Sequence, residues 1–149
     1  ILKIKNMNIE KLFVSYDIAK QLKDKWCNEP CLGWFQFENY GTKVHTDKYW
    51  KEKLSGLSAE EFLNAPLYQQ VIDWFRETHG IGINVVQQSY EMIKHYEEKS
   101  KNSMPMFFYY FTAKTEAQTQ NIKSKVTGRG GDNYHELLIK AIEEALKLI

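Results

Sequence analysis

Two cysteines and a histidine in the first third of the chain are residue types that bind zinc. Cys27 and Cys31 are separated by three residues, and His45 follows them. Paired cysteines with a gap of about two to four residues are typical of structural zinc sites, but such sites are usually completed by a second ligand pair. The remaining histidines lie far along the chain and form no such pair. The pattern favours reduced thiols packed beside aromatic rings, with no metal and no cofactor.

A glycine-rich loop, Gly128-Arg129-Gly130-Gly131, precedes the expected last helix. Backbone N–H groups of such a loop can bind a phosphate, helped by the positive end of the helix dipole. The loop lacks the lysine and hydroxyl residue of a P-loop and follows no clear parallel strand. A flexible entry to the helix is therefore the simpler interpretation. If an anion does bind, Arg129 is the residue we expect to contact it.

The aromatic run Phe107–Phe111 is expected to form a strand, and Lys123 and Lys125 follow it. Proteins that bind single-stranded nucleic acid stack bases on exposed rings and hold the backbone with basic side chains. Because strand side chains alternate, half of these rings must face the core. The RNP signature of RNA-binding sheets is also absent. Nucleic-acid binding through an aromatic and basic sheet face, with Lys123, Lys125 and Arg129 as contacts, is the second of our hypotheses.

Two carboxylates, Asp73 and Glu77, are four residues apart on the expected exposed side of a helix, next to Arg76. Paired carboxylates can do acid–base chemistry, but on a surface helix they are usually solvated or paired with neighbouring cations. No nucleophile and base stand in a recognised catalytic motif. The sequence leaves enzymatic activity uncertain and leans against it.

Charge and composition argue against several broad classes of protein, among them duplex-binding, membrane-spanning and secreted proteins. Lys and Arg total 20 and Asp and Glu total 19, whereas duplex-binding proteins usually carry a basic excess. No apolar run reaches the ~18 residues of a membrane span, and no signal-peptide pattern is present. A cytoplasmic protein without membrane contact is expected.

The 149 residues suit one domain, so we expect 1–149 to be a single domain, with residues 1–6 as a candidate non-native or disordered extension.

The elements that position these residues follow from capping signals and apolar periodicity. The predicted helices are Tyr16–Lys25 after the cap Ser15, a short one from the capping box at Ser58 to about Asn64, Pro66–His79, and Asn133–Leu148 after the cap Asp132. The predicted strands are Cys31–Glu38, Thr42–Thr46, Ile81–Gln88, a central Met106–Ala113 and a weak edge strand at Ile122–Thr127. Tyr90–Tyr96 stays ambiguous between strand and helix, Glu97–Ser103 is the expected hairpin loop, and Lys114–Gly131 is an expected polar connection.

This order predicts an α+β fold, with a small antiparallel sheet and three main helices packed mostly on one face. The helical and alternating periods place a set of apolar side chains in the core: Val71, Phe75, Ile83 and Ile142.

Several segments, in the same order, are similar to one family. They are Phe13–Ala19, Asn28–Leu32, Ala65–Glu77, His79–Ile81 and the closing stretch from Tyr134–Leu137 through Glu143–Leu146. They resemble a family of short uncharacterised proteins common in Bacteroidetes genomes and their phages and prophages. The chain departs from that pattern at Trp26, where a glycine is expected, and between Tyr90 and Arg129. The resemblance implies a phage or mobile-element accessory protein inside a bacterial host cell, and it implies no catalytic residue.

Our leading hypothesis is a non-enzymatic protein-interaction module that binds a host or phage protein. Exposed tyrosine and tryptophan rings dominate many protein interfaces, and the rings we expect to serve here are Tyr40, Tyr49, Trp50 and Tyr68. Homo-oligomerisation through an uncovered sheet face or an edge strand is a further expectation.

Overall fold

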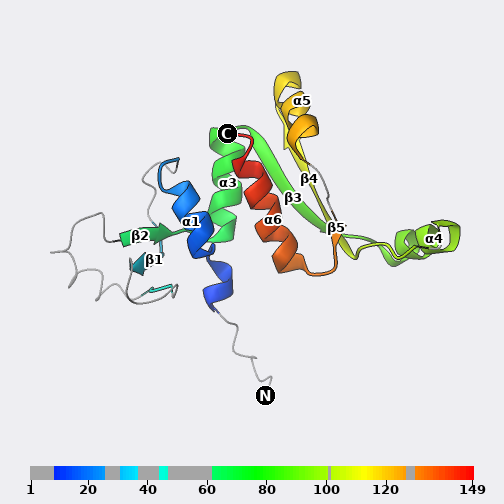
Figure 1. The fold of residues 1–149 in the computed structure, drawn as a ribbon, viewed down its shortest axis with the longest axis horizontal. Helices are drawn as coiled ribbons and strands as arrows, with labels where there is room; N and C mark the ends of the chain where they lie inside the picture. Colours follow the sequence, from blue (N-terminus) through cyan, green and yellow to red (C-terminus); the bar gives the residue numbers. More distant parts are fainter. Residues whose placement is uncertain (1–8, 26–30, 37–43, 47–61, 101, 127–129) are drawn as a thin grey trace, which may run out of the picture. The chain divides into compact units, whose positions relative to one another are not determined.

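A computed structural model describes residues 9–25, 31–36, 44–46, 62–100, 102–126 and 130–149 (Figure 1). The chain divides into two compact units, Ile1–Val71 and Ile72–Ile149. Each unit contains helices and a small antiparallel sheet, which confirms the α+β class. The prediction of one small sheet is wrong, because the strands form a two-stranded and a three-stranded sheet.

The first unit begins with the 3-10 helix η1 (Ile9–Leu12) and the helix α1 (Tyr16–Leu22). Ser15 caps α1 as predicted, because its hydroxyl accepts a hydrogen bond of 3.3 Å from the backbone N–H of Ile18. The buried side chains are Ile18, Ala19 and Leu22, which confirms the helical spacing expected for one face.

The sheet of the first unit pairs β1 (Gly33–Gln36) with β2 (Phe62–Ala65), antiparallel, with Gly33 opposite Ala65. The short helix expected to run to Asn64 is wrong from Phe62 onward, because buried Leu63 and Ala65 alternate with exposed Asn64 at the period of a strand. Its predicted start at Ser58 lies outside the described residues.

The predicted strand Thr42–Thr46 contributes one isolated bridge to the described part of the first unit. His45 and Trp34 exchange backbone hydrogen bonds of 2.9 and 3.0 Å, and their rings stack with centroids 4.6 Å apart. Residues 42 and 43 lie outside the described residues.

The second unit is built on the strands β3 (Ile81–Gln87), β4 (Phe107–Ala113) and β5 (Gly130–Gly131). The sheet order is β3-β4-β5 with both pairs antiparallel, so the predicted central place of the aromatic strand is confirmed. The helix α3 (Tyr68–Thr78) leads into β3 through Gly80, whose φ of 68° is a left-handed conformation that favours glycine.

The last helix, α6 (Tyr134–Leu146), packs against all three strands of this sheet (Figure 1). Its buried side chains include Leu138, Ala141, Ile142 and Ala145, at the spacing expected for one helical face. Its N-cap is Asn133, whose side chain accepts a hydrogen bond of 3.1 Å from the N–H of Glu136. The predicted cap, Asp132, instead accepts a hydrogen bond of 3.1 Å from the N–H of Met106, the residue before β4.

Two helices occupy segments that were left ambiguous or predicted as loop, polar connection or edge strand. The expected hairpin loop Glu97–Ser103 begins inside the helix α4 (Tyr90–Ser100). The predicted edge strand Ile122–Thr127 overlaps the helix α5 (Glu116–Lys125), where Thr115 and Gln118 form a reciprocal capping box. In the described residues, no helix is both long enough and apolar enough to cross a bilayer.

Candidate interaction surfaces

Two of the three predicted basic contacts lie on α5 and not on the edge strand expected there. Lys123 and Lys125 are both exposed, and the ammonium group of Lys125 donates a hydrogen bond of 3.0 Å to the backbone carbonyl of Lys147. Lys125 therefore fixes the end of α6 as well as carrying a surface charge. Arg129, the third predicted contact, lies outside the described residues.

Tyr68 does not present the exposed ring that was expected. It is only 6% exposed, because it starts α3 on the same side of the helix as the buried Val71, three residues later. A tyrosine hydroxyl lets this residue occur at surfaces, so its type alone did not reveal its position. The other predicted partner contacts, Tyr40, Tyr49 and Trp50, lie outside the described residues.

Two of the three candidate zinc ligands lie among the described residues. Cys31 and His45 are half-buried, and the His45 ring stacks on Trp34. Cys27 lies outside the described residues. Among the residues that are described, no three of the types His, Cys, Asp and Glu come together in a group that could hold a metal ion.

One of the two carboxylates of α3 forms a surface ion pair, as expected. The guanidinium group of Arg76 donates a hydrogen bond to the Asp73 carboxylate, and both side chains are substantially exposed. Glu77 is exposed on the same helix. An exposed ion pair between neighbours on a helix is a common surface interaction, so its geometry does not point to acid–base catalysis.

The sheet of the second unit has one buried face and one more open face. Ile81, Ile83 and Tyr109 point to the buried face and are at most 6% exposed. Tyr110, the next residue along β4, is 36% exposed, because successive strand side chains point to opposite sides. We call the second side the open sheet face; in β3 and β4 it consists of Gly82, Asn84, Val86, Phe108, Tyr110 and Thr112.

The open sheet face is aromatic and uncharged. The rings of Phe108 and Tyr110 stack along β4, with centroids 6.1 Å apart and planes inclined by 29°. Val86 of β3 lies opposite Phe108, and Asn84 lies opposite Tyr110. None of the residues that β3 and β4 contribute to this face carries a charge. The face can therefore bury rings and aliphatic groups, but these strands supply no cation for a phosphate.

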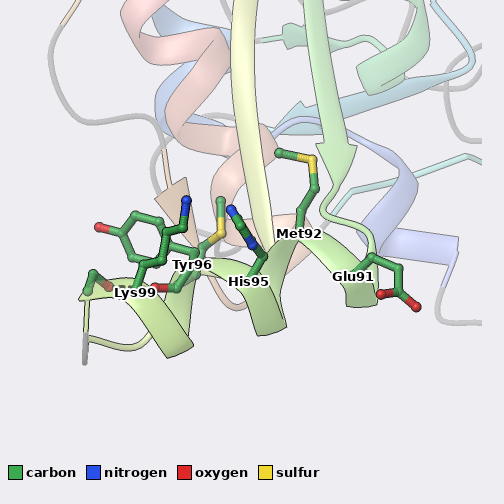
Figure 2. Close-up of a pocket in the computed structure, with 7 residues that line it drawn as sticks. Glu91, Met92, His95, Tyr96 and Lys99 are labelled. Carbon is green, nitrogen blue, oxygen red and sulfur yellow. Dashed lines mark hydrogen bonds between the residues drawn. The ribbon is translucent and has the colours of Figure 1, made fainter.

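A second surface lies on α4 and was missed by the sequence analysis. Figure 2 shows Met92, His95 and Tyr96 along one side of this helix, with Glu91 toward one end and Lys99 toward the other. They line an apolar hollow of about 600 Å³ together with Ser100 and Met104. We call the members of this set that lie on α4 the α4 stripe: Glu91, Met92, His95, Tyr96, Lys99 and Ser100. Met92 and Tyr96 at helical spacing were a usable signal, but the absence of a longer periodic run left the helix ambiguous.

The helix that carries the α4 stripe is held by local hydrogen bonds. None of its residues is buried. The Ser89 hydroxyl accepts a hydrogen bond of 3.2 Å from the N–H of Met92, as an N-cap does. The Ser100 hydroxyl donates a hydrogen bond of 2.9 Å to the carbonyl of Tyr96. These hydrogen bonds stabilise the two ends of the helix, while the side chains of Met92 and Tyr96 remain exposed to solvent.

A smaller hollow of about 320 Å³ is lined by His79, Ile81, Gln118, Asn121, Leu148 and Ile149. Its amide side chains join elements of the second unit. Gln118 donates a hydrogen bond of 2.6 Å to the carbonyl of His79, and Asn121 donates one of 3.2 Å to the carbonyl of Leu148. These two side chains of α5 therefore have a structural role.

Comparisons with protein-family models, with curated proteins and with solved structures find no match to this chain.

Proposed function

We propose that this chain is a non-enzymatic protein-interaction module, and that its open sheet face contacts the partner. The observation that carries the proposal is the stacked pair Phe108 and Tyr110 on a face without charged residues from β3 and β4. Aromatic residues are enriched at the centres of protein interfaces and charged residues are depleted there. The partner chemistry that fits is a neutral, largely apolar protein surface.

The resemblance to Bacteroidetes and phage proteins extends the proposal to the biological setting. The partner is then a host or phage protein, met in the cytoplasm of a bacterial cell. The chain acts as an accessory protein of a phage or mobile element, and it works by binding rather than by catalysis.

The test uses the purified chain as bait in lysate of a native host, with Tyr110→Ser as the variant and Tyr90→Ser as the matched control. Tyr90 is 72% exposed and belongs to neither the open sheet face nor the α4 stripe. We expect a specific protein to be recovered, and its purified form to bind Tyr110→Ser about tenfold or more weakly. Binding to Tyr90→Ser should stay within about twofold of the unmodified chain.

Two results would overturn the proposal. One is that no specific protein is recovered from a host lysate. The other is that the recovered protein binds Tyr110→Ser as tightly as it binds the unmodified chain. Circular dichroism melting curves of both variants ensure that lost binding does not come from lost folding.

Nucleic-acid binding is the second candidate function. It is favoured by the same two rings, since bases stack on aromatic side chains, and by the exposed Lys123 on α5. It predicts that labelled single-stranded DNA or RNA is retarded at low salt, and that retardation falls as salt rises. Loss of that retardation in both Tyr110→Ser and Lys123→Ala would replace the protein-interaction proposal with this one.

A further inference from the structure

The α4 stripe leaves apolar side chains without a cover in the described chain. Met92 is 57% exposed and Tyr96 is 44% exposed, and no residue of α4 is buried. A helix of 11 residues is marginal in water by itself, since isolated helices shorter than ~12–15 residues rarely persist. A partner that covered the α4 stripe would remove Met92 and Tyr96 from water and so stabilise the helix.

The charges of the α4 stripe indicate which partner fits. Glu91 precedes His95 by four residues, and Lys99 follows His95 by four residues. All three line the same hollow, and Figure 2 shows the carboxylate and the ammonium group toward opposite ends of the row. A helix with acid at one end and base at the other complements a copy of itself that runs in the opposite direction.

We propose that the α4 stripe binds the α4 stripe of a second copy of this chain, antiparallel, about a two-fold axis between His95 and Tyr96. A two-fold contact is self-complementary, so each interaction occurs twice. Glu91 then lies beside the partner's Lys99, within about one residue's rise of ~1.5 Å along the helix axis.

The apolar residues follow the same symmetry. Met92 meets the aliphatic stem of the partner's Lys99, and His95 meets the partner's Tyr96. Lysine stems commonly cover apolar surface while the ammonium group stays in water.

The antiparallel direction is favoured over the parallel one by the same charges. Two parallel copies in register would bring Glu91 beside the partner's Glu91 and Lys99 beside the partner's Lys99, and like charges at an interface disfavour it. The proposal goes beyond the protein-interaction function above, because the α4 stripe shares no residue with the open sheet face.

The experiment measures mass by sedimentation velocity over a concentration series up to ~100 µM. We expect the full chain to reach twice its monomer mass of 17.6 kDa. Glu91→Lys and Lys99→Glu, each alone, should weaken self-association by roughly tenfold or more, and the double exchange should restore it to within about threefold. Restoration by the double exchange excludes a general folding defect in the single variants.

Matched controls lie on the same helix but outside the α4 stripe. Lys94→Glu and Glu97→Lys change exposed charges of α4 that do not line the hollow. We expect each control to change the dimer dissociation constant by less than about threefold. A Tyr96→Ser variant should be monomeric at concentrations where the unmodified chain is a dimer.

A chain that stays monomeric at ~100 µM would overturn the proposal. A dimer would also overturn it if the single charge variants leave the dissociation constant unchanged, or if the double exchange fails to restore it. These outcomes are separable from those of the partner test, because Tyr110→Ser should leave the dimer intact, and the α4 variants should still bind a partner at the open sheet face.

Discussion

At the scale of single residues, Gly80 shows how backbone conformation restricts side chains. Its φ of 68° ends α3 and turns the chain into β3. An added Cβ would come within 3.2 Å of the Lys114 side chain, but that flexible chain end can move. Conformational strain is therefore the main cost of a side chain at this position.

We predict that Gly80→Ala lowers the free energy of unfolding by about 1 kcal/mol. Gly80→Asn should cost less, because asparagine tolerates the left-handed region better. Urea unfolding followed by circular dichroism measures both. Equal stability of the alanine variant and the unmodified chain would show that φ at residue 80 is not positive in solution.

The stability that an apolar side chain of α6 contributes depends on how far that side chain is buried. Ile142 is 0% exposed, whereas Ile139 on the same helix is only half-buried. We predict that Ile142→Ala costs about 2–5 kcal/mol of unfolding free energy, and that Ile139→Ala costs clearly less. Denaturant unfolding of both variants shows which substitution lowers the free energy of unfolding more. The reverse order would mean that α6 presents a different face to the sheet.

At the scale of elements, capping decides where two helices form in polar sequence. In α5 the Thr115 hydroxyl accepts a hydrogen bond of 3.2 Å from the N–H of Gln118. The Gln118 side-chain oxygen accepts one of 3.3 Å in return from the N–H of Thr115. Polar helices with few buried residues depend on such local interactions.

We predict that Thr115→Ala destabilises α5 by about 1 kcal/mol. The matched control is Ser124→Ala, an exposed position whose hydroxyl donates a hydrogen bond of 2.8 Å to the carbonyl of Asn121. Hydrogen exchange of α5 amides should accelerate in the first variant and change little in the second. Similar acceleration in both would contradict the capping role of Thr115.

At the scale of the whole molecule, the described elements differ in how much packing supports them. β4 is paired on both sides, and its Tyr109 is 0% exposed. No residue of α4 is buried. Local opening is expected where buried apolar contacts are few.

We predict that amides of β4 exchange most slowly in the sheet of the second unit, and that amides of α4 exchange fastest among its helices. Raising the protein concentration through the dimer range should slow exchange in α4, because the second copy then covers it. Hydrogen exchange read by mass spectrometry at two concentrations measures this. Exchange in α4 that does not depend on concentration would count against the dimer.

Much of the fold could be predicted from strongly periodic or clearly capped segments. Val71, Phe75, Ile83 and Ile142 are buried as predicted, since an apolar stripe with a regular period has only one side that can face a core. α5 was not predicted and α4 stayed ambiguous between strand and helix, because short helices with few apolar residues show no sustained period. Tyr68 could not be placed, because tyrosine occurs both in cores and at surfaces.

The sequence by itself determined the α+β class, the main helices, the central aromatic strand and the burial of Val71, Phe75, Ile83 and Ile142. These depend on periodicity and capping, which are properties of neighbouring residues. Only the tertiary structure decided the division into two sheets, the side of β4 that stays open, and the exposure of the α4 stripe. Those features depend on which distant segments cover a given face, and local spacing carries no information about that.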